Sequence, residues 1–405
     1  MAGEKFAGGW STAAVVGLAA SACGGCAQIL DVDWGSYTDA GGAGGTGGSI
    51  GSGGAASTGG GAGESAEDED SRPEIVCVPG RDRQCSGNTP QRCNDTGQWE
   101  DEAPCRAEAP ACSGGACTFW SCAGLEATCG PTGKESCCAS AAVPGGSFTR
   151  WDQGTEHSAT VSGFLLDRFE VTVGRFRRFV EAYPGSMPAP RAGVHPKIDG
   201  SGWDAGWNGR LPADAAALKA AVNCNADRQA WTDEVGGHER LPMNCLSWYV
   251  AFAFCSWDGG RLPTEAEWHY AAAGGDEQRP YPWSDPASDD RIDTSYAVYD
   301  CAGDGSASGS CAFSDLQPVG SRSTRGDGRW KQADLAGNVW EWVLDWHVAY
   351  PPECNDCAEL AAASSRVMRG GSYYDAALSL LSYSRGSLDP SSRYGDGGAR
   401  CARTP

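Results

Sequence analysis

The feature that most constrains the fold of this chain is its cysteine content. The 405 residues include 20 cysteines, which is typical of an oxidising compartment, where cysteines pair as disulfides, more than of the cytosol. Structural zinc is the alternative, but it needs paired Cys-x2-Cys groups with matched spacing. Only two pairs have that spacing, Cys23 with Cys26 and Cys354 with Cys357, and they lie in unrelated regions. Disulfides are therefore the expected role of most cysteines.

The N-terminal segment is typical of a secretory signal. Lys5 gives a weakly positive start, and residues 11–22 are small and apolar but too short to span a bilayer. Cys23 and Cys26 follow small residues, a pattern that resembles the lipidation site of bacterial lipoproteins. Acylation of Cys26 after cleavage leaves eighteen cysteines to pair, whereas cleavage before Cys23 leaves an odd number. We predict a lipoprotein signal peptide over 1–25 with Cys26 lipidated and Cys23 as the alternative; ordinary cleavage to a secreted protein stays open.

The expected location follows from the same residues. Gly24 follows one candidate cysteine and Ala27 the other. By resemblance to bacterial lipoprotein sorting, the lack of Asp there predicts a lipid anchor in the outer membrane, facing the periplasm or the cell surface. The net charge of -21 argues against nucleic acid and against charge-driven membrane binding. The simplest interpretation of that charge is a solvated acidic surface.

Two segments separate the signal from the main domain. Residues 26–76 are rich in Gly, Ala, Ser and acidic residues. They cannot bury enough apolar surface to fold, so we expect a disordered linker. Residues 77–125 hold seven cysteines among turn residues and few apolar ones, which predicts a small module stapled by disulfides. Seven is odd, so at least one should pair with Cys129, Cys137 or Cys138. The module is interpreted as a structural cap or spacer, with ligand binding as the alternative.

The remaining residues, 126–405, carry amphipathic helix signals. Thr172 is a plausible N-cap for a helix with apolar residues on one face that ends near 184–185. A second helix should start near Ser247 and end at 259–260. Thr264 and Glu267 form the pattern of a capping box at the start of a third helix, which should close within 271–274.

Several motifs in this region resemble the formylglycine-generating enzyme, or sulfatase-modifying factor, family. They are Val143–Phe148, Arg261–Trp268, Tyr281–Trp283, Gly337–Trp342 and Arg369–Tyr373 with the positions that follow up to Cys401. The resemblance implies an α+β fold related to C-type lectins, with long irregular loops. Trp residues would mainly pack those loops in the core, the alternative being ligand stacking.

The resemblance also implies metal sites. Family members often bind calcium at the Gly337–Trp342 motif, which nominates Asn338, Val339 and Glu341 as oxygen ligands. The alternative is that Glu341 pairs structurally without metal. Copper-dependent members carry two cysteines just after the Gly-Gly-Ser-aromatic turn. Asp375 and Leu380 stand at the comparable places, which argues against copper because Cu(I) prefers two thiolates.

A groove and a disulfide are implied as well. The family groove would lie near Tyr373, Tyr374 and Asp375, with Arg369 and Arg385 recognising a peptide, a protein or a small anionic ligand. The alternative is that these arginines make buried pairs with carboxylates that organise loops. Cysteines at the places of Cys255 and Cys401 pair in relatives. That bridge would close a loop of about 150 residues, worth about 4 to 5 kcal/mol in the chain-entropy model. Local spacing suggests two further bridges: Cys301–Cys311 and Cys224–Cys245.

Three functions stay open at this point. The favoured one is a tethered, non-catalytic or divergent module that binds a partner or supports structure, because the thiol pair is missing. The second is an enzyme that modifies an exported protein or a small substrate by metal-dependent oxidation. A calcium-dependent lectin is the third and rests on fold analogy alone.

Overall fold

The computed structural model describes residues 76–106, 109–152, 155–306 and 311–405, apart from the side chain of Asp152. The chain divides into two units, Met1–Arg72 and Pro73–Pro405, and the description below concerns the second. Cys23, Cys26 and most of the expected linker lie outside the described residues. Within the described ranges, every helix is too short or too polar to cross a bilayer.

The Cys-rich segment forms two small antiparallel sheets. The first has the order β1-β2-β3, and a hairpin of β4 and β5 follows it. Their bounds are β1 Arg83–Ser86, β2 Thr89–Cys93, β3 Trp99–Asp101, β4 Ala111–Ser113 and β5 Ala116–Thr118. Three disulfides lie within this part: Cys77–Cys93, Cys85–Cys112 and Cys105–Cys117. The seventh cysteine, Cys122, pairs with Cys138, which confirms the expectation from the odd count.

The three predicted helices of the main domain are confirmed. Helix α2 spans Val173–Ala182, and the Thr172 hydroxyl accepts a hydrogen bond from the Arg175 N–H at 3.2 Å. Helix α4 spans Trp248–Trp257 and is capped by Ser247. Helix α5 spans Glu265–Ala272 and has the predicted capping box. The other helical elements are α3 Ala215–Val222 and the 3-10 turns η1 Trp120–Cys122, η2 Ala205–Arg210, η3 Gly275–Glu277, η4 Phe313–Asp315 and η5 Ala377–Leu380.

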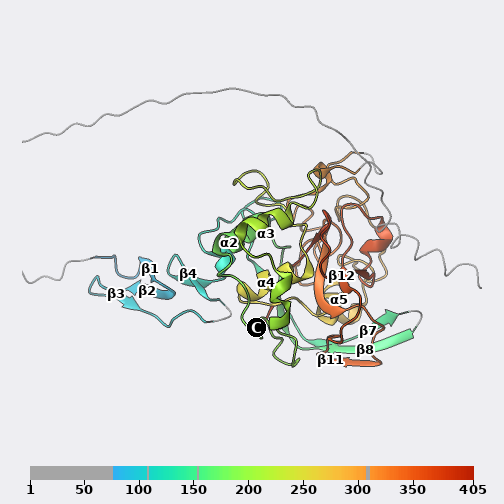
Figure 1. The fold of residues 1–405 in the computed structure, drawn as a ribbon, viewed down its shortest axis with the longest axis horizontal. Coiled ribbons are helices and arrows are strands. Elements are labelled where there is room, and N and C mark those ends of the chain that lie inside the picture. Colours follow the sequence, from blue (N-terminus) through green and yellow to red (C-terminus); the bar gives the residue numbers. More distant parts are fainter. Residues whose placement is uncertain (1–75, 107–108, 153–154, 307–310) are drawn as a thin grey trace, which may run out of the picture. The chain divides into compact units, whose positions relative to one another are not determined.

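Short strands of the main domain form three sheets with the orders β13-β12-β10-β14, β11-β8-β7 and β15-β9-β6. Figure 1 shows β7, β8 and β11 running side by side. The bounds are β6 Ser140–Val143, β7 Gly146–Asp152, β8 Thr155–Val161, β9 Phe164–Asp167, β10 Trp340–Trp346, β11 Glu353–Asn355, β12 Arg366–Arg369, β13 Gly386–Leu388, β14 Gly397–Gly398 and β15 Ala402–Arg403. The mixture of helices, short strands and long irregular segments is the predicted α+β class, preceded by the disulfide-rich module.

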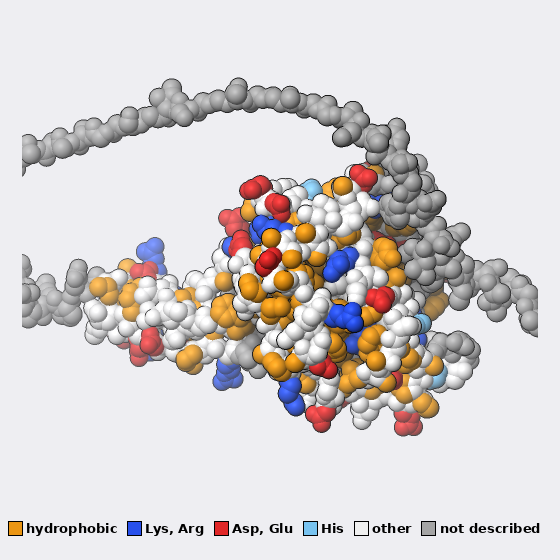
Figure 2. Space-filling model, in the orientation of Figure 1, with side chains coloured by type: hydrophobic (Ala, Val, Ile, Leu, Met, Phe, Trp, Pro, Cys, Tyr) orange, Lys and Arg blue, Asp and Glu red, His pale blue; other side chains and the backbone are white. Residues whose placement is uncertain are grey.

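Aromatic side chains fill the core, as the sequence predicted for the Trp residues. The largest apolar cluster joins α2 and α4 to β10 and includes the buried rings of Trp203, Trp231, Trp248 and Trp342. A second cluster packs α5 against β8 and β9 and includes Trp268. On the face that Figure 2 shows, acidic, basic and apolar side chains are interspersed over the main domain.

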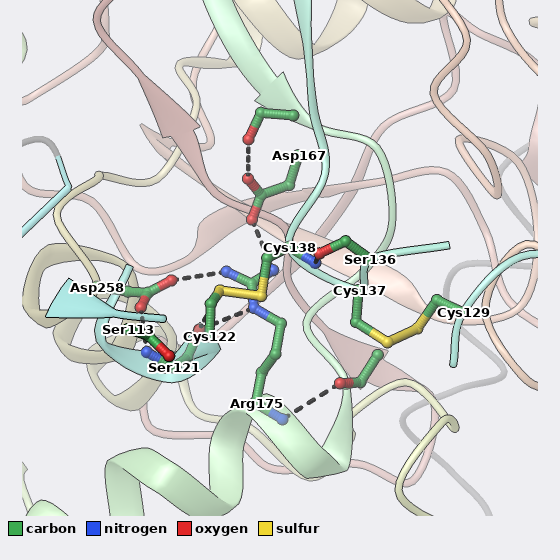
Figure 3. The surroundings of a disulfide bond; sticks show 12 residues. Ser113, Ser121, Cys122, Cys129, Ser136, Cys137, Cys138, Asp167, Arg175 and Asp258 are labelled. Atoms are coloured by element: carbon green, nitrogen blue, oxygen red, sulfur yellow. Dashed lines mark hydrogen bonds and ion pairs between the residues drawn. A yellow bond between two sulfur atoms is a disulfide. The ribbon is translucent and has the colours of Figure 1, made fainter. Parts of the chain in front are cut away.

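Four buried charged side chains tie α2 to the C-terminal strand and to the segment that carries Cys122. This buried quartet consists of Asp167, Arg175, Asp258 and Arg403, whose side chains are at most 1% exposed. Each arginine pairs with both carboxylates. Asp258 also accepts from the Ser121 N–H at 2.7 Å. Figure 3 shows Arg175 between Asp167 and Asp258, with the Cys122–Cys138 disulfide beside it.

The cysteines of the main domain are paired as well. Cys255 in α4 is joined to Cys401, the pairing that the family resemblance implied, across 146 residues. The other bridges are Cys129–Cys137, Cys224–Cys245, Cys301–Cys311 and Cys354–Cys357. All eighteen cysteines from Cys77 to Cys401 are therefore in disulfides in the described part of the chain.

Candidate functional site

A glycine turn at the end of β12 sets the geometry of the candidate site. Gly370 and Gly371 have φ angles of +97° and +71°, which side chains with a Cβ rarely adopt. A Cβ on Gly371 would lie 2.7 Å from a methyl carbon of Leu380. The Gly370 carbonyl accepts from the Gly337 N–H at 2.9 Å, so the turn lies against the motif that begins β10. Glycine is therefore required for the chain to reverse here.

Asp375 holds the loop that follows this turn. One of its carboxylate oxygens accepts from the Trp340 indole at 2.8 Å, the Ser372 hydroxyl at 2.5 Å and the Ser372 N–H at 3.1 Å. Desolvation raises the pKa of Asp375 above its ordinary value, although these hydrogen bonds oppose the rise. The side chain that stands where the resemblance places a copper thiol thus acts as an internal acceptor.

Tyr373 and Tyr374 point to different environments. Tyr373 is buried, and burial is the main reason that its pKa is raised, with the charge of Asp396 adding to the effect. Burial and the nearby Asp375 raise the pKa of Asp396 to about 6. Tyr374 is 41% exposed, and the Arg228 guanidinium lies over its ring at 4.8 Å. Of the two tyrosines, Tyr374 is the one that offers a surface.

Two more apolar side chains of the same ten-residue segment are exposed. Leu378 in η5 is 74% exposed and Tyr383 is 48% exposed. The backbone of this segment is held by the protein, because the Tyr281 hydroxyl donates to the Ala377 carbonyl at 3.2 Å. We refer to Tyr374, Leu378 and Tyr383 as the Tyr374 surface. Sequence reasoning did not nominate Leu378 or Tyr383; the available signal was the group of Tyr and Leu residues within 374–383.

Leu380 occupies the other place that the resemblance assigns to a copper thiol. It is fully buried and packs with the rings of Tyr281 and Trp283. The sulfur of Cys301 lies 3.9 Å from the Tyr374 carbonyl oxygen, but Cys301 is bonded to Cys311. The described residues around this turn therefore offer disulfide sulfur and no thiolate.

The two arginines nominated for the groove lie next to the carboxylate of Glu265, the first residue of α5. Arg385 donates to both carboxylate oxygens of Glu265, at 2.7 and 2.9 Å. The Nε atom of Arg369 lies 3.7 Å from the same carboxylate, and its side chain is fully buried. The structure thus brings these arginines together with Glu265, not with the Tyr374 surface. This is the structural alternative, in which arginine–carboxylate pairs organise loops.

Glu341, nominated as a calcium ligand, forms an ion pair with the guanidinium of Arg400. Arg400 donates to its two carboxylate oxygens at 2.7 and 2.6 Å, and the Trp268 indole donates at 2.7 Å. The two charged side chains are at most 1% exposed. A bidentate guanidinium–carboxylate pair of this kind satisfies both partners in the interior.

Glu170 completes this network and was missed by sequence reasoning. It accepts from the Asn338 amide at 2.7 Å and from the Val339 N–H at 3.1 Å. Burial raises the pKa of Glu170 well above its ordinary value, with Asp334 and Glu341 adding to the rise. The signal was available, because an acidic residue stands between apolar residues just before α2.

The side-chain oxygens of two of the three nominated calcium ligands, Asn338 and Glu341, already accept hydrogen bonds within the protein. The Asn338 side-chain oxygen accepts from the Gln317 N–H at 3.1 Å, and Glu341 is occupied by Arg400 and Trp268. Within the described ranges, no group of three or more His, Cys, Asp or Glu side chains is arranged to hold a metal ion. Calcium binding at Asn338, Val339 and Glu341 stays a prediction, which experiment can test.

Comparison with known proteins finds relatives named as formylglycine-generating enzymes and as inactive forms of that enzyme. The formylglycine-generating enzyme of Streptomyces coelicolor is 31% identical over 292 residues, which cover 64% of this chain and 87% of that protein. The inactive C-alpha-formylglycine-generating enzyme 2 of Bos taurus is 30% identical over 256 residues, or 58% of this chain and 76% of that one.

A solved structure and a family match complete the comparison. The structure of PvdO from Pseudomonas aeruginosa matches 65% of this chain and 93% of that chain, at 22% identity and a TM-score of 0.46. Residues 126–405 match the family described as the sulfatase-modifying factor enzyme 1-like domain. This chain therefore belongs to the sulfatase-modifying factor family, through a domain that occupies residues 126–405.

Proposed function

We propose that this chain is a tethered binding or structural module built on the sulfatase-modifying factor fold, without copper-dependent oxidase activity. The observation that supports the proposal is the lack of a free cysteine thiol among the described residues near the Gly370–Gly371 turn. Asp375 and Leu380 stand at the expected thiol places, one as a hydrogen-bond acceptor and one in the core. Every described cysteine is in a disulfide. Cu(I) needs soft thiolates, so the described part lacks its usual ligands.

The Tyr374 surface is the proposed contact face. Its three exposed side chains belong to one segment that is fixed at both ends, by Asp375 on one side and by the Arg385–Glu265 pair on the other. Exposed tyrosines on a fixed backbone supply contact area at low entropic cost. The partner that suits such a face is a polypeptide segment with an apolar anchor side chain.

The tether is the second part of the proposal. A lipid on Cys26, or on Cys23, would hold the module at the outer membrane through the Gly-rich linker. The membrane is then a partner through the anchor alone, and nucleic acid is not a partner because of the acidic charge of -21. Mass spectrometry of the mature N-terminus tests this part, and an unacylated N-terminus beyond Ala27 would contradict it.

Binding can be tested with the full chain and a displayed peptide library. Peptides selected on the purified protein should bind the wild type and lose at least about tenfold in affinity to Leu378→Asp, since an anchor contact contributes more than about 1.4 kcal/mol. Val235→Asp is the matched control, because Val235 is exposed to the same 74% but lies elsewhere. Equal losses in both variants, or none in Leu378→Asp, would refute the assigned face.

An enzyme remains the second candidate. It is favoured by the match to the Streptomyces coelicolor formylglycine-generating enzyme, which spans 87% of that protein. Such an enzyme would modify an exported protein or a small substrate by metal-dependent oxidation. Its decisive sign would be an aldehyde formed from a substrate cysteine.

A further inference from the structure

Three arginines converge on the carboxylate of Glu265 from different parts of the chain. Arg385 binds it in a bidentate manner, and Arg369 at the end of β12 lies 3.7 Å away. Arg150 in β7 faces the same group, because its guanidinium lies 4.1 Å from the ring of Tyr350, whose hydroxyl donates to Glu265 at 3.0 Å. Arg150 is 2% exposed and Arg369 is fully buried. We call this set the Glu265 cluster.

The charges of the Glu265 cluster do not balance. Asp345 is the other carboxylate that faces it, and both of its oxygens already accept backbone N–H groups, from Glu265 at 2.7 Å and Glu359 at 2.9 Å. Burial raises the pKa of Asp345 to about 7, with the charge of Glu265 adding to the rise. Three guanidinium groups therefore face at most two negative charges. An excess of buried positive charge is costly unless a counter-charge is present.

The same arginines have donors without acceptors. The Nε and Nη2 atoms of Arg150 and of Arg369 are buried and have no hydrogen-bond partner in the protein. His269, one turn into α5, also has a buried Nδ1 atom without a partner. Desolvation, followed by the charges of Arg369, Arg150 and Arg385, keeps the pKa of His269 well below its ordinary value. Buried donors are nearly always satisfied, so the unpaired N–H groups of Arg150 and Arg369 call for an acceptor from outside the chain.

Aromatic faces supply only part of that compensation. The Tyr350 ring lies 4.1 Å from the guanidinium groups of both Arg150 and Arg385, and Trp268 lies 5.3 Å from that of Arg369. These contacts use the faces of the guanidinium groups, whereas N–H bonds lie in their planes. A water molecule would accept the hydrogen bonds but would leave the excess charge. A small anion would satisfy the donors and balance the charge.

We propose that Arg150 and Arg369 hold a buried monovalent inorganic anion of the halide class beside Glu265, as a structural part of the fold. The near-complete burial of both arginines restricts the ligand to a small ion, and the excess of at least one positive charge favours an anion. The proposed ion would link β7, which carries Arg150, to β12, which carries Arg369, next to Glu265 at the start of α5. Its role is independent of the Tyr374 surface, so either proposal can fail without the other.

Bromide provides a direct probe, because it scatters anomalously and substitutes for chloride. In crystals of the wild-type protein grown with bromide, we expect an anomalous peak in contact with the guanidinium groups of Arg150 and Arg369. Peaks confined to the protein surface, or a water molecule at this position, would overturn the proposal. The measurement uses unmodified protein and does not depend on a variant that folds.

Chloride linkage provides the second measurement. With gluconate replacing chloride at constant ionic strength, the folding equilibrium constant should rise in proportion to chloride once its concentration exceeds the dissociation constant. Arg369→Met should remove this dependence, and Arg150→Met serves if that variant fails to fold. Arg178→Met is the matched control, because Arg178 makes an exposed pair with Glu181. A wild-type folding equilibrium constant that does not change with chloride concentration would also overturn the proposal.

Discussion

Neutralising Asp258 should remove a large part of the stability of the main domain. Its carboxylate accepts from Arg175 at 2.7 Å, from Arg403 at 3.0 Å and from the Ser121 N–H at 2.7 Å. Asp258→Asn keeps the size of the side chain but leaves two buried guanidinium groups facing Asp167 alone. Breaking a buried pair typically costs about 3 to 5 kcal/mol. The variant should therefore lose a substantial share of a total stability of about 5 to 15 kcal/mol.

The assay is urea unfolding with the disulfides intact, followed by Trp fluorescence and checked by circular dichroism for a single transition. Glu181→Gln is the matched control, because it breaks the exposed pair with Arg178 and should cost less than about 1 kcal/mol. Adding Arg403→Met to Asp258→Asn should recover part of the loss, because charge balance returns. A loss below about 1 kcal/mol in Asp258→Asn would show that the buried quartet does not fix this part of the fold.

Three further predictions concern pH, a disulfide and calcium. Burial raises the pKa of Asp334 to about 6 and that of Asp345 to about 7, so the folded state holds these protons more tightly than the unfolded state. Stability should therefore fall as pH rises from about 4.5 to about 7, by up to about 1.4 kcal/mol per pH unit for each group; a urea midpoint that rises over this range would contradict the assignment. Replacing Cys255 and Cys401 together by Ala should cost about 4 to 5 kcal/mol in unfolding experiments, and an unchanged midpoint would argue against the bridge. Calcium added after chelation should leave the melting temperature unchanged, because Arg400 already neutralises the nominated ligand; a clear rise would instead revive the calcium site.

The sequence predicted best those features that depend on neighbours along the chain. The capping box of Thr264 and Glu267 was readable because its two residues are three positions apart. The Glu265 cluster was not, because Arg385 and Glu265 are 120 residues apart and only the tertiary fold brings them together. Glu170 likewise meets Asn338 across 168 residues. The family resemblance therefore nominated Arg369 and Arg385 for a groove, whereas in the structure both arginines lie next to Glu265.

The family motif gave the position of the turn but not the environment of its side chains. Gly370 and Gly371 marked a backbone reversal that the structure contains. Whether Asp375 would face solvent or accept from Trp340 depends on how β10 packs beside the turn, which local sequence does not encode. Exposure of Leu378 is equally non-local, because it depends on what packs over η5.

We propose that this member of the family does not oxidise a substrate thiol with copper. The most direct measurement is incubation of the purified full chain with copper and a Cys-x-Pro-x-Arg peptide of the sulfatase type, followed by mass spectrometry of the peptide. We expect the mass of the peptide cysteine to remain unchanged, with the Streptomyces coelicolor formylglycine-generating enzyme run in parallel as the control. Conversion of the peptide thiol to an aldehyde by this chain would contradict the account.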